Sequence, residues 1–149
     1  MNETNGMNNY YSIIDASVFI KAHIINPDQE RCLLLLNKLK KSKILVPSLW
    51  LNEVTSVLAK LVHFGQITPQ ESKDSLRLAL TLDFEVIEPD NTQCQLALEW
   101  AHRLNRVSAY DCFYLAIADS YEIPFWTADK RLYNVLKDMN LIWLNWIFD

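Results

Sequence analysis

The sequence predicts an α/β fold, a three-layer sandwich in which a mainly parallel five-stranded sheet carries helices on both faces. Five short runs rich in β-branched and aromatic residues alternate with longer stretches of helical periodicity, and the runs span residues 10–14, 43–47, 84–88, 123–127 and 141–148. Strands that alternate with helices pair in parallel through crossover connections. Nearly continuous apolar strands also indicate burial on both faces.

The helices between these strands are expected over residues 21–41, 48–64, 68–82, 91–104, 109–120 and 129–138. Ordinary start and stop signals mark several of their ends. Thr68 and Glu71 predict a capped start for the third helix, and Asp90 or Thr92 is the expected cap of the fourth. Gly65 stands where the second helix should end.

The composition indicates one globular domain. Half of the 149 residues are apolar, so we expect a single domain over residues 9–149, preceded by a loose, asparagine-rich tail over 1–8. The three cysteines are widely spaced and form no C-x-x-C pair, which favours a reducing, cytoplasmic location. No apolar run reaches the length of a bilayer span, so we expect no membrane association.

Charge and glycine content exclude several classes of function. The net charge of −4 argues against strong non-specific electrostatic binding to nucleic acids. A nuclease stays compatible with this charge, because clustered metal-binding carboxylates themselves lower it. With two glycines, Gly6 and Gly65, the chain has no glycine-rich phosphate loop, which excludes P-loop NTPases and typical Rossmann dehydrogenases.

Four carboxylates are predicted to meet at one end of the sheet. Asp15 follows the first strand directly, and Asp129 follows the fourth strand after one alanine. Glu53 lies early in the helix after the second strand, while Asp111 opens the helix that leads into the fourth strand. Ligands of parallel α/β sheets bind outside the carboxyl ends of the strands, and all four acids fall at that end.

Each acid also has a simpler interpretation as a helix-end residue. Ser108 and Asp111 resemble a capping box, Asp15 and Asp129 can cap helices, and the flank position of Glu53 is often solvated. Four independent caps, however, have no reason to share one rim. Packed carboxylates raise one another's pKa, and a hard cation such as Mg²⁺ relieves the repulsion. The cluster is therefore a candidate metal site, able to polarise a phosphoryl oxygen and to activate water.

The chain resembles PIN-domain ribonucleases, and in particular the compact VapC-type toxins of bacterial toxin–antitoxin pairs. The similarity covers about residues 10–149. It rests on four blocks in order, which are "IIDASVFI" (13–20), "VPSLWLNEVTSVL" (46–58), "VSAYDCFYLAIA" (107–118) and "FWTADKRL" (125–132). The last two blocks with their short separation are the most specific part of the match.

The resemblance implies a PIN-like three-layer sandwich and a Mg²⁺- or Mn²⁺-dependent endoribonuclease that hydrolyses RNA phosphodiester bonds. By the same resemblance, the metal-binding and catalytic residues are Asp15, Glu53, Asp111 and Asp129. Thr127 matches a hydroxyl residue that orients the site, and Ser17 matches a small polar position beside the first acid. The resemblance further implies a homodimer and a cognate antitoxin protein as partner.

Basic residues near the acids are candidate contacts for RNA phosphates. They are Lys21 in the first helix, Arg106 just before Asp111, and Lys130 and Arg131 just after Asp129. The densest basic run, residues 37–43, precedes the second strand. We therefore expect it at the opposite end of the sheet, as a solvated helix end.

Two other functions stay open at this point. One is phosphoryl transfer through a nucleophilic aspartate, although Ser17 stands where the dehalogenase pattern has its second acid. The other is a non-catalytic RNA- or protein-binding module whose acids only stabilise helix ends. The aromatic run 141–148 is a further expectation, because a strand so apolar needs cover from a second copy or a protein partner.

Overall fold

A computed structural model of the chain describes residues 10–105 and 109–149. Its five strands form one sheet, and all four pairings in it are parallel. In the sheet order β3-β2-β1-β4-β5, the strands are β1 (Tyr11–Ile14), β2 (Lys43–Pro47), β3 (Glu85–Ile87), β4 (Phe125–Thr127) and β5 (Leu144–Trp146). The predicted α/β fold class with a parallel five-stranded sheet is therefore confirmed.

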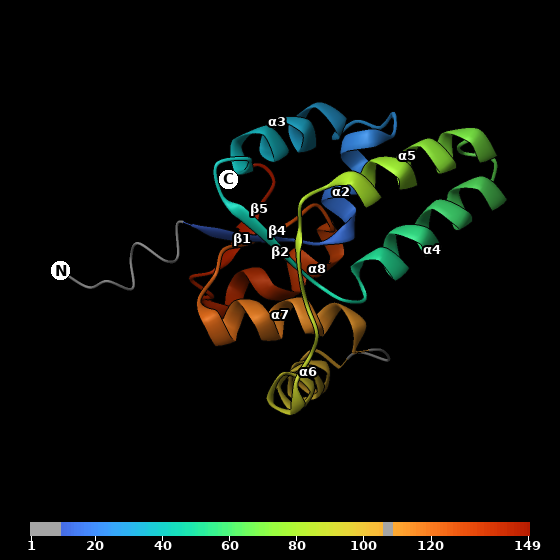
Figure 1. Ribbon diagram of the computed structural model, residues 1–149. Helices are drawn as coiled ribbons and strands as arrows, with labels where there is room; N and C mark the ends of the chain where they lie inside the picture. The colour runs from blue at the N-terminus through green and yellow to red at the C-terminus, as the bar shows by residue number, and fades with distance from the viewer. Residues whose placement is uncertain (1–9, 106–108) are drawn as a thin grey trace.

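Helices cover both faces of the sheet (Figure 1). Within the described residues they are α2 (Ala16–His23), α3 (Gln29–Leu39), α4 (Trp50–His63), α5 (Pro69–Thr81), α6 (Asn91–Arg103), α7 (Tyr110–Tyr121) and α8 (Lys130–Leu136), followed by a 3₁₀ turn, η1 (Lys137–Met139). The pair α2 and α3 lies over one face, and α7 lies on the other with α6 beneath it. The pair α4 and α5 packs as a hairpin that extends away from the sheet.

Several helix ends follow their sequence signals. Thr68 and Glu71 form a capping box at the start of α5, and Gly65 adopts a φ of 70° just after α4 ends. Asp90 caps α6 in a second capping box with Gln93. Of the two caps that the sequence left open there, Asp90 is therefore the correct one.

The helix predicted over residues 21–41 is wrong as a single element. Helix α2 already starts at Ala16, directly after the first strand, and the chain turns between α2 and α3. Pro27 lacks an amide hydrogen and disfavours helical conformation in the residue before it. The side-chain amide of Asn26 completes the break by donating to the carbonyl oxygens of Lys21, at 2.7 Å, and Ile24, at 2.6 Å.

The C-terminal strand is shorter than the predicted run 141–148, and the chain itself buries Trp143 and partly covers Trp146. Trp143 is buried, with its ring 5.9 Å from that of Trp100, and Trp146 stacks on Tyr133 with ring centroids 4.9 Å apart. Phe148 is 55% exposed. The expectation of external cover is therefore wrong for Trp143, whereas Trp146 is only partly buried by the chain itself.

The buried apolar side chains form one continuous cluster that spans both faces of the sheet. Phe19 from α2 and Leu115 from α7 lie in it with strand residues such as Ile13 and Phe125. This packing fixes the strand ends from which the predicted site residues project. In the part of the chain that the structure describes, no helix is both long and apolar enough to cross a bilayer.

Candidate functional site

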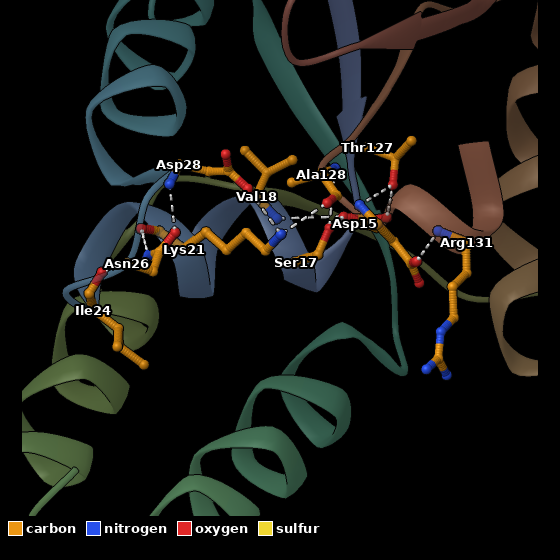
Figure 2. Close-up of polar contacts among 11 residues, drawn as sticks. Asp15, Ser17, Val18, Lys21, Ile24, Asn26, Asp28, Thr127, Ala128 and Arg131 are labelled. Carbon is orange, nitrogen blue, oxygen red and sulfur yellow. Dashed lines mark hydrogen bonds and ion pairs between the residues drawn. The ribbon is translucent and has the colours of Figure 1, made fainter. Parts of the chain in front are cut away.

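Asp15 lies at the junction of β1 and α2, and it is only 7% exposed. Its Oδ1 accepts a hydrogen bond from the amide of Val18 at 3.3 Å, so the carboxylate caps α2. The Ser17 hydroxyl also donates to Oδ1, and the Thr127 hydroxyl donates to Oδ2 at 2.5 Å (Figure 2). Both carboxylate oxygens are thereby oriented by neighbouring groups.

The same two hydroxyls tie Asp15 to the turn after β4. The Ser17 Oγ accepts from the amide of Ala128 at 3.1 Å, and the Thr127 Oγ1 accepts from the amide of Asp129 at 3.0 Å. Thr127 is fully buried, so this arrangement is shielded from water. The structure therefore brings Ser17, Thr127 and the backbone of Asp129 into one hydrogen-bonded network around Asp15.

Asp129 has a structural task as well as its place near Asp15. Its Oδ1 accepts hydrogen bonds from the amides of Arg131, at 2.9 Å, and Leu132, at 3.2 Å, and so caps α8. Asp15 and Asp129 therefore do cap helices, as the simpler interpretation predicts. Capping does not explain why the pKa values of Asp15 and Glu53 are raised.

Burial disfavours the charge on Asp15. Desolvation raises the pKa of its carboxyl from 3.8 to about 6, and the nearby charge of Asp129 adds to the rise. The hydrogen bonds from Ser17, Thr127 and the Val18 amide act in the opposite direction, because they stabilise the ionised form. Removal from water outweighs them.

Glu53 is the acid that helix capping does not explain. It lies in the first turn of α4, and burial together with the charges of Asp111 and Asp15 raises its pKa from 4.5 to about 8. Its Oε1 is buried and has no hydrogen-bond partner among the described residues. The neighbouring Tyr114 hydroxyl lowers this pKa but does not cancel the rise, and buried charges are ordinarily paired or bound to a metal.

Asp111 lies in the first turn of α7, close enough to Glu53 to raise the pKa of that residue. The residue at the N-cap of α7 is Ala109, which makes no side-chain cap. The proposed capping box partner Ser108 lies outside the described residues, as does the phosphate-contact candidate Arg106. The four predicted acids are thus linked electrostatically, Glu53 to Asp111 and Asp15, and Asp15 to Asp129.

Tyr114 belongs to this cluster, and the sequence reasoning missed it. The residue is 1% exposed, and its hydroxyl has no partner with hydrogen-bond geometry among the described residues, although it lies near Glu53. Burial raises its pKa, and the charges of Glu53, Asp15 and Asp111 raise it further. The signal was present in the spacing, since residues three apart share one face of a helix and Tyr114 follows Asp111 by three.

The surroundings of these acids fit a hard divalent cation. All candidate ligands are carboxylate oxygens, which Mg²⁺ and Mn²⁺ accept. The raised pKa values of Asp15 and Glu53, and the lack of a hydrogen-bond partner for Glu53 Oε1 among the described residues, show that ionisation of these carboxyls is unfavourable without a cation. As the side chains are placed, no three His, Cys, Asp or Glu residues of the described ranges converge enough to enclose an ion. Mg²⁺ in proteins keeps several waters and takes one or two carboxylates directly.

The candidate phosphate-binding residues differ in whether their side chains already form contacts within the protein. The Lys21 ammonium forms an ion pair with Asp28 at 3.2 Å and donates to the carbonyl oxygen of Ala128 at 3.1 Å (Figure 2). Lys21 therefore joins the turn after α2 to the turn after β4. The side chains of Lys130 and Arg131 are exposed at the start of α8, beside Asp129.

The fold and the site place the protein in the class of parallel α/β domains that carry carboxylates at the carboxyl ends of their strands. The PIN domain family model matches residues 12–137, so the chain belongs to the PIN domain family. The family resemblance seen in the sequence is thereby confirmed. Membership in this family supports a nuclease activity.

Solved structures with a similar fold include toxin–antitoxin proteins. VapBC2 from Rickettsia felis, bound to a DNA fragment from its promoter, has a TM-score of 0.65 at 15% identity, over 91% of this chain and 98% of that chain. The sarcin–ricin loop cleaving toxin VapC20 from Mycobacterium tuberculosis has 0.60 at 13%, over 78% and 86%. FitAcB from Neisseria gonorrhoeae has 0.60 at 15%, over 85% and 93%. No curated protein sequence matches the chain.

Proposed function

We propose that the chain is a Mg²⁺- or Mn²⁺-dependent endoribonuclease, the toxin of a toxin–antitoxin pair. The observation that supports this most directly is Glu53, whose buried Oε1 has no hydrogen-bond partner among the described residues and whose pKa is raised by Asp111 and Asp15. A structural acid at a helix end would be expected to find a donor. A metal-binding acid in the absence of its cation would be left in this state.

Each residue has a distinct role in the proposal. Asp15 and Asp111 would hold the cation directly, with Glu53 and Asp129 in direct or water-mediated support. When bound, the cation would polarise a phosphoryl oxygen and lower the pKa of an attacking water. Thr127 and Ser17 fix the Asp15 carboxylate through their hydrogen bonds. Oδ1 accepts from both Ser17 and the Val18 amide, whereas Oδ2 accepts from Thr127 and keeps a lone pair for a ligand.

The basic candidates would place the substrate. Lys130 and Arg131 are exposed next to Asp129, where they would contact phosphates on either side of the scissile bond. Lys21 is bound to Asp28 and Ala128, so it would act by holding the site together as much as by binding phosphate. Arg106 completes the proposed set.

RNA as substrate and an antitoxin as partner are supported by the family and by the structural neighbours. VapC20 is described as a sarcin–ricin loop cleaving toxin, and other neighbours were solved as toxin–antitoxin complexes. At these identities the neighbours show the fold, so substrate and partner are proposals for this chain. We also propose the homodimer that the resemblance implies, and the molar mass of the purified protein from light scattering tests it.

Cleavage of a defined panel of single-stranded and hairpin RNAs tests the proposal. Mg²⁺ or Mn²⁺ should support cleavage and EDTA should abolish it, and Asp15→Asn should lower the rate by on the order of 100-fold. Asp138→Asn, the same change at an exposed position, is the matched control. A folded Asp15→Asn protein that cleaves as fast as the control would refute the assignment.

A non-catalytic binding module is the second candidate, because Asp15 and Asp129 do cap helices. That function predicts no specific binding of divalent cations. Calorimetric titration with Mn²⁺ separates the two candidates. Saturable binding that is lost in Asp15→Asn supports the nuclease, and its absence from the wild-type protein supports the module.

A further inference from the structure

A cavity opens at the opposite end of the sheet from the acids. It has a volume of about 650 Å³, and we call it the basic cavity. Tyr10 just before β1, Ile44 in β2 and Phe84 just before β3 line it. The acids follow the carboxyl ends of the strands. A strand rises about 3.3 Å per residue, so a five-residue strand separates the two regions by roughly 15 Å.

The floor of the basic cavity is apolar. Leu36 of α3, Ile44 of β2 and Phe84 just before β3 contribute to it. The Phe84 ring is half-buried and packs edge to face against Trp50, with centroids 4.8 Å apart. This contact holds the Phe84 ring in place, so it offers a fixed aromatic surface to a flat apolar group.

The rim of the basic cavity is charged. Lys40, Lys41 and Lys43 come from the end of α3 and the turn into β2, and Asp83 lies on the wall beside Phe84. Lys43 pairs with Glu85 at 3.4 Å, whereas Lys40 and Lys41 form no ion pair within the described residues. The helix dipole favours lysines at the C-terminal end of α3, but it does not explain why they border a cavity lined by apolar residues.

We propose that the basic cavity binds a ribonucleotide unit. The base would lie against Phe84, the Asp83 carboxylate would accept hydrogen bonds from the ribose hydroxyls, and Lys40 and Lys41 would hold the phosphate. The volume suits such a ligand, since pockets for small molecules measure roughly 300–1,000 Å³. This site shares no residue with the acid cluster, so the proposal does not depend on the nuclease function.

The ribonucleotide unit has two possible sources, a mononucleotide in solution or one nucleotide of an RNA strand. Both present the same base, ribose and phosphate, and the experiment separates them. The probe is 5′-AMP, titrated into the full chain in EDTA so that no cation bridges phosphate to the acids. Calorimetry gives the affinity, and amide shifts in NMR spectra locate the binding.

Lys40→Glu/Lys41→Glu is the informative variant, and Lys60→Glu/Lys73→Glu is its control. The control makes the same charge change on the exposed α4–α5 hairpin. We expect AMP to bind with shifts at residues 36–44 and 83–84. The rim variant should weaken binding at least about tenfold, and the control less than about twofold, because charged hydrogen bonds to phosphate are strong.

Phe84→Leu separates stacking from charge. It should weaken AMP several-fold while leaving ribose 5-phosphate nearly unchanged, since only AMP carries a base to stack. A pentameric RNA that displaces AMP identifies the site as one for a nucleotide within RNA, and failure to displace it identifies a mononucleotide site. Either result supports the proposal.

Three results would overturn it. They are no saturable AMP binding to the wild-type chain at millimolar concentration, equal binding by the rim variant and its control, or inorganic phosphate binding as tightly as AMP. The last result would show an anion site without recognition of base or ribose.

Discussion

Glu53→Gln should stabilise the metal-free protein at neutral pH, although it removes a charge from a position that we assign to the active site. The wild-type carboxyl has a pKa of about 8 in the folded chain and an ordinary value of 4.5. The folded state therefore binds a proton at pH 7.5 that the unfolded state has already released. Folding carries a free-energy penalty for this uptake, and a glutamine of nearly the same shape does not carry it.

The size of the penalty follows from the two pKa values. Between 4.5 and pH 7.5 it amounts to roughly 4 kcal/mol, and since Glu53 is partly exposed, solvent screening reduces our expectation to about 2 kcal/mol. Because the folded pKa is raised, the penalty is absent below about pH 4.5. It grows as the pH rises towards 8, and it is constant above that.

Urea unfolding in EDTA at pH 4.5, 6, 7.5 and 9 measures the effect. The gain from Glu53→Gln should be largest at pH 7.5 and 9 and should vanish near pH 4.5. Glu99→Gln, at an exposed position on α6, should change the free energy of unfolding little at any of these pH values.

A second arm of the experiment adds Mn²⁺. The cation should raise the melting temperature of the wild-type protein more than that of Glu53→Gln, because a ligand stabilises the state that binds it. The reasoning is refuted if Glu53→Gln lowers the free energy of unfolding at pH 7.5, or if its gain is as large at pH 4.5. The first outcome would mean that the ionised carboxylate makes favourable contacts, and the second that the gain does not come from the raised pKa.

Two further predictions concern the network around Asp15. Thr127→Val removes the hydroxyl that donates to Asp15 and accepts from the amide of Asp129, so it should lower the free energy of unfolding by about 2–3 kcal/mol. Thr127→Ser keeps the hydroxyl and should lower it by only about 1 kcal/mol. Equal losses for the two variants in denaturant titrations would contradict a stabilising role of the hydroxyl. Lys21→Met removes the ion pair with Asp28 and the hydrogen bond to the Ala128 carbonyl oxygen, and should lose about 1 kcal/mol. Unchanged stability together with weakened RNA binding would instead indicate a pure phosphate contact.

The order of strands and helices could be predicted from the sequence because it depends on local patterns. Gly65 ends α4, and Thr68 with Glu71 starts α5, since each of these signals acts through hydrogen bonds or dihedral angles within a few residues. The break at Asn26 and Pro27 was also encoded locally. The apolar periodicity continues on both sides of Pro27, so periodicity alone predicts one helix where the structure has two.

The sequence by itself determined the fold class and the end of the sheet to which Asp15, Glu53, Asp111 and Asp129 belong, because parallel strands place their carboxyl ends together whatever their length. Only the tertiary structure decided how these acids are held. The Thr127 hydroxyl meets Asp15 across 112 positions of the chain. Burial by several elements at once leaves the Oε1 of Glu53 without a hydrogen-bond partner among residues 10–105 and 109–149. Contacts between distant segments and removal from water are properties of packing, and no local pattern of residues records them.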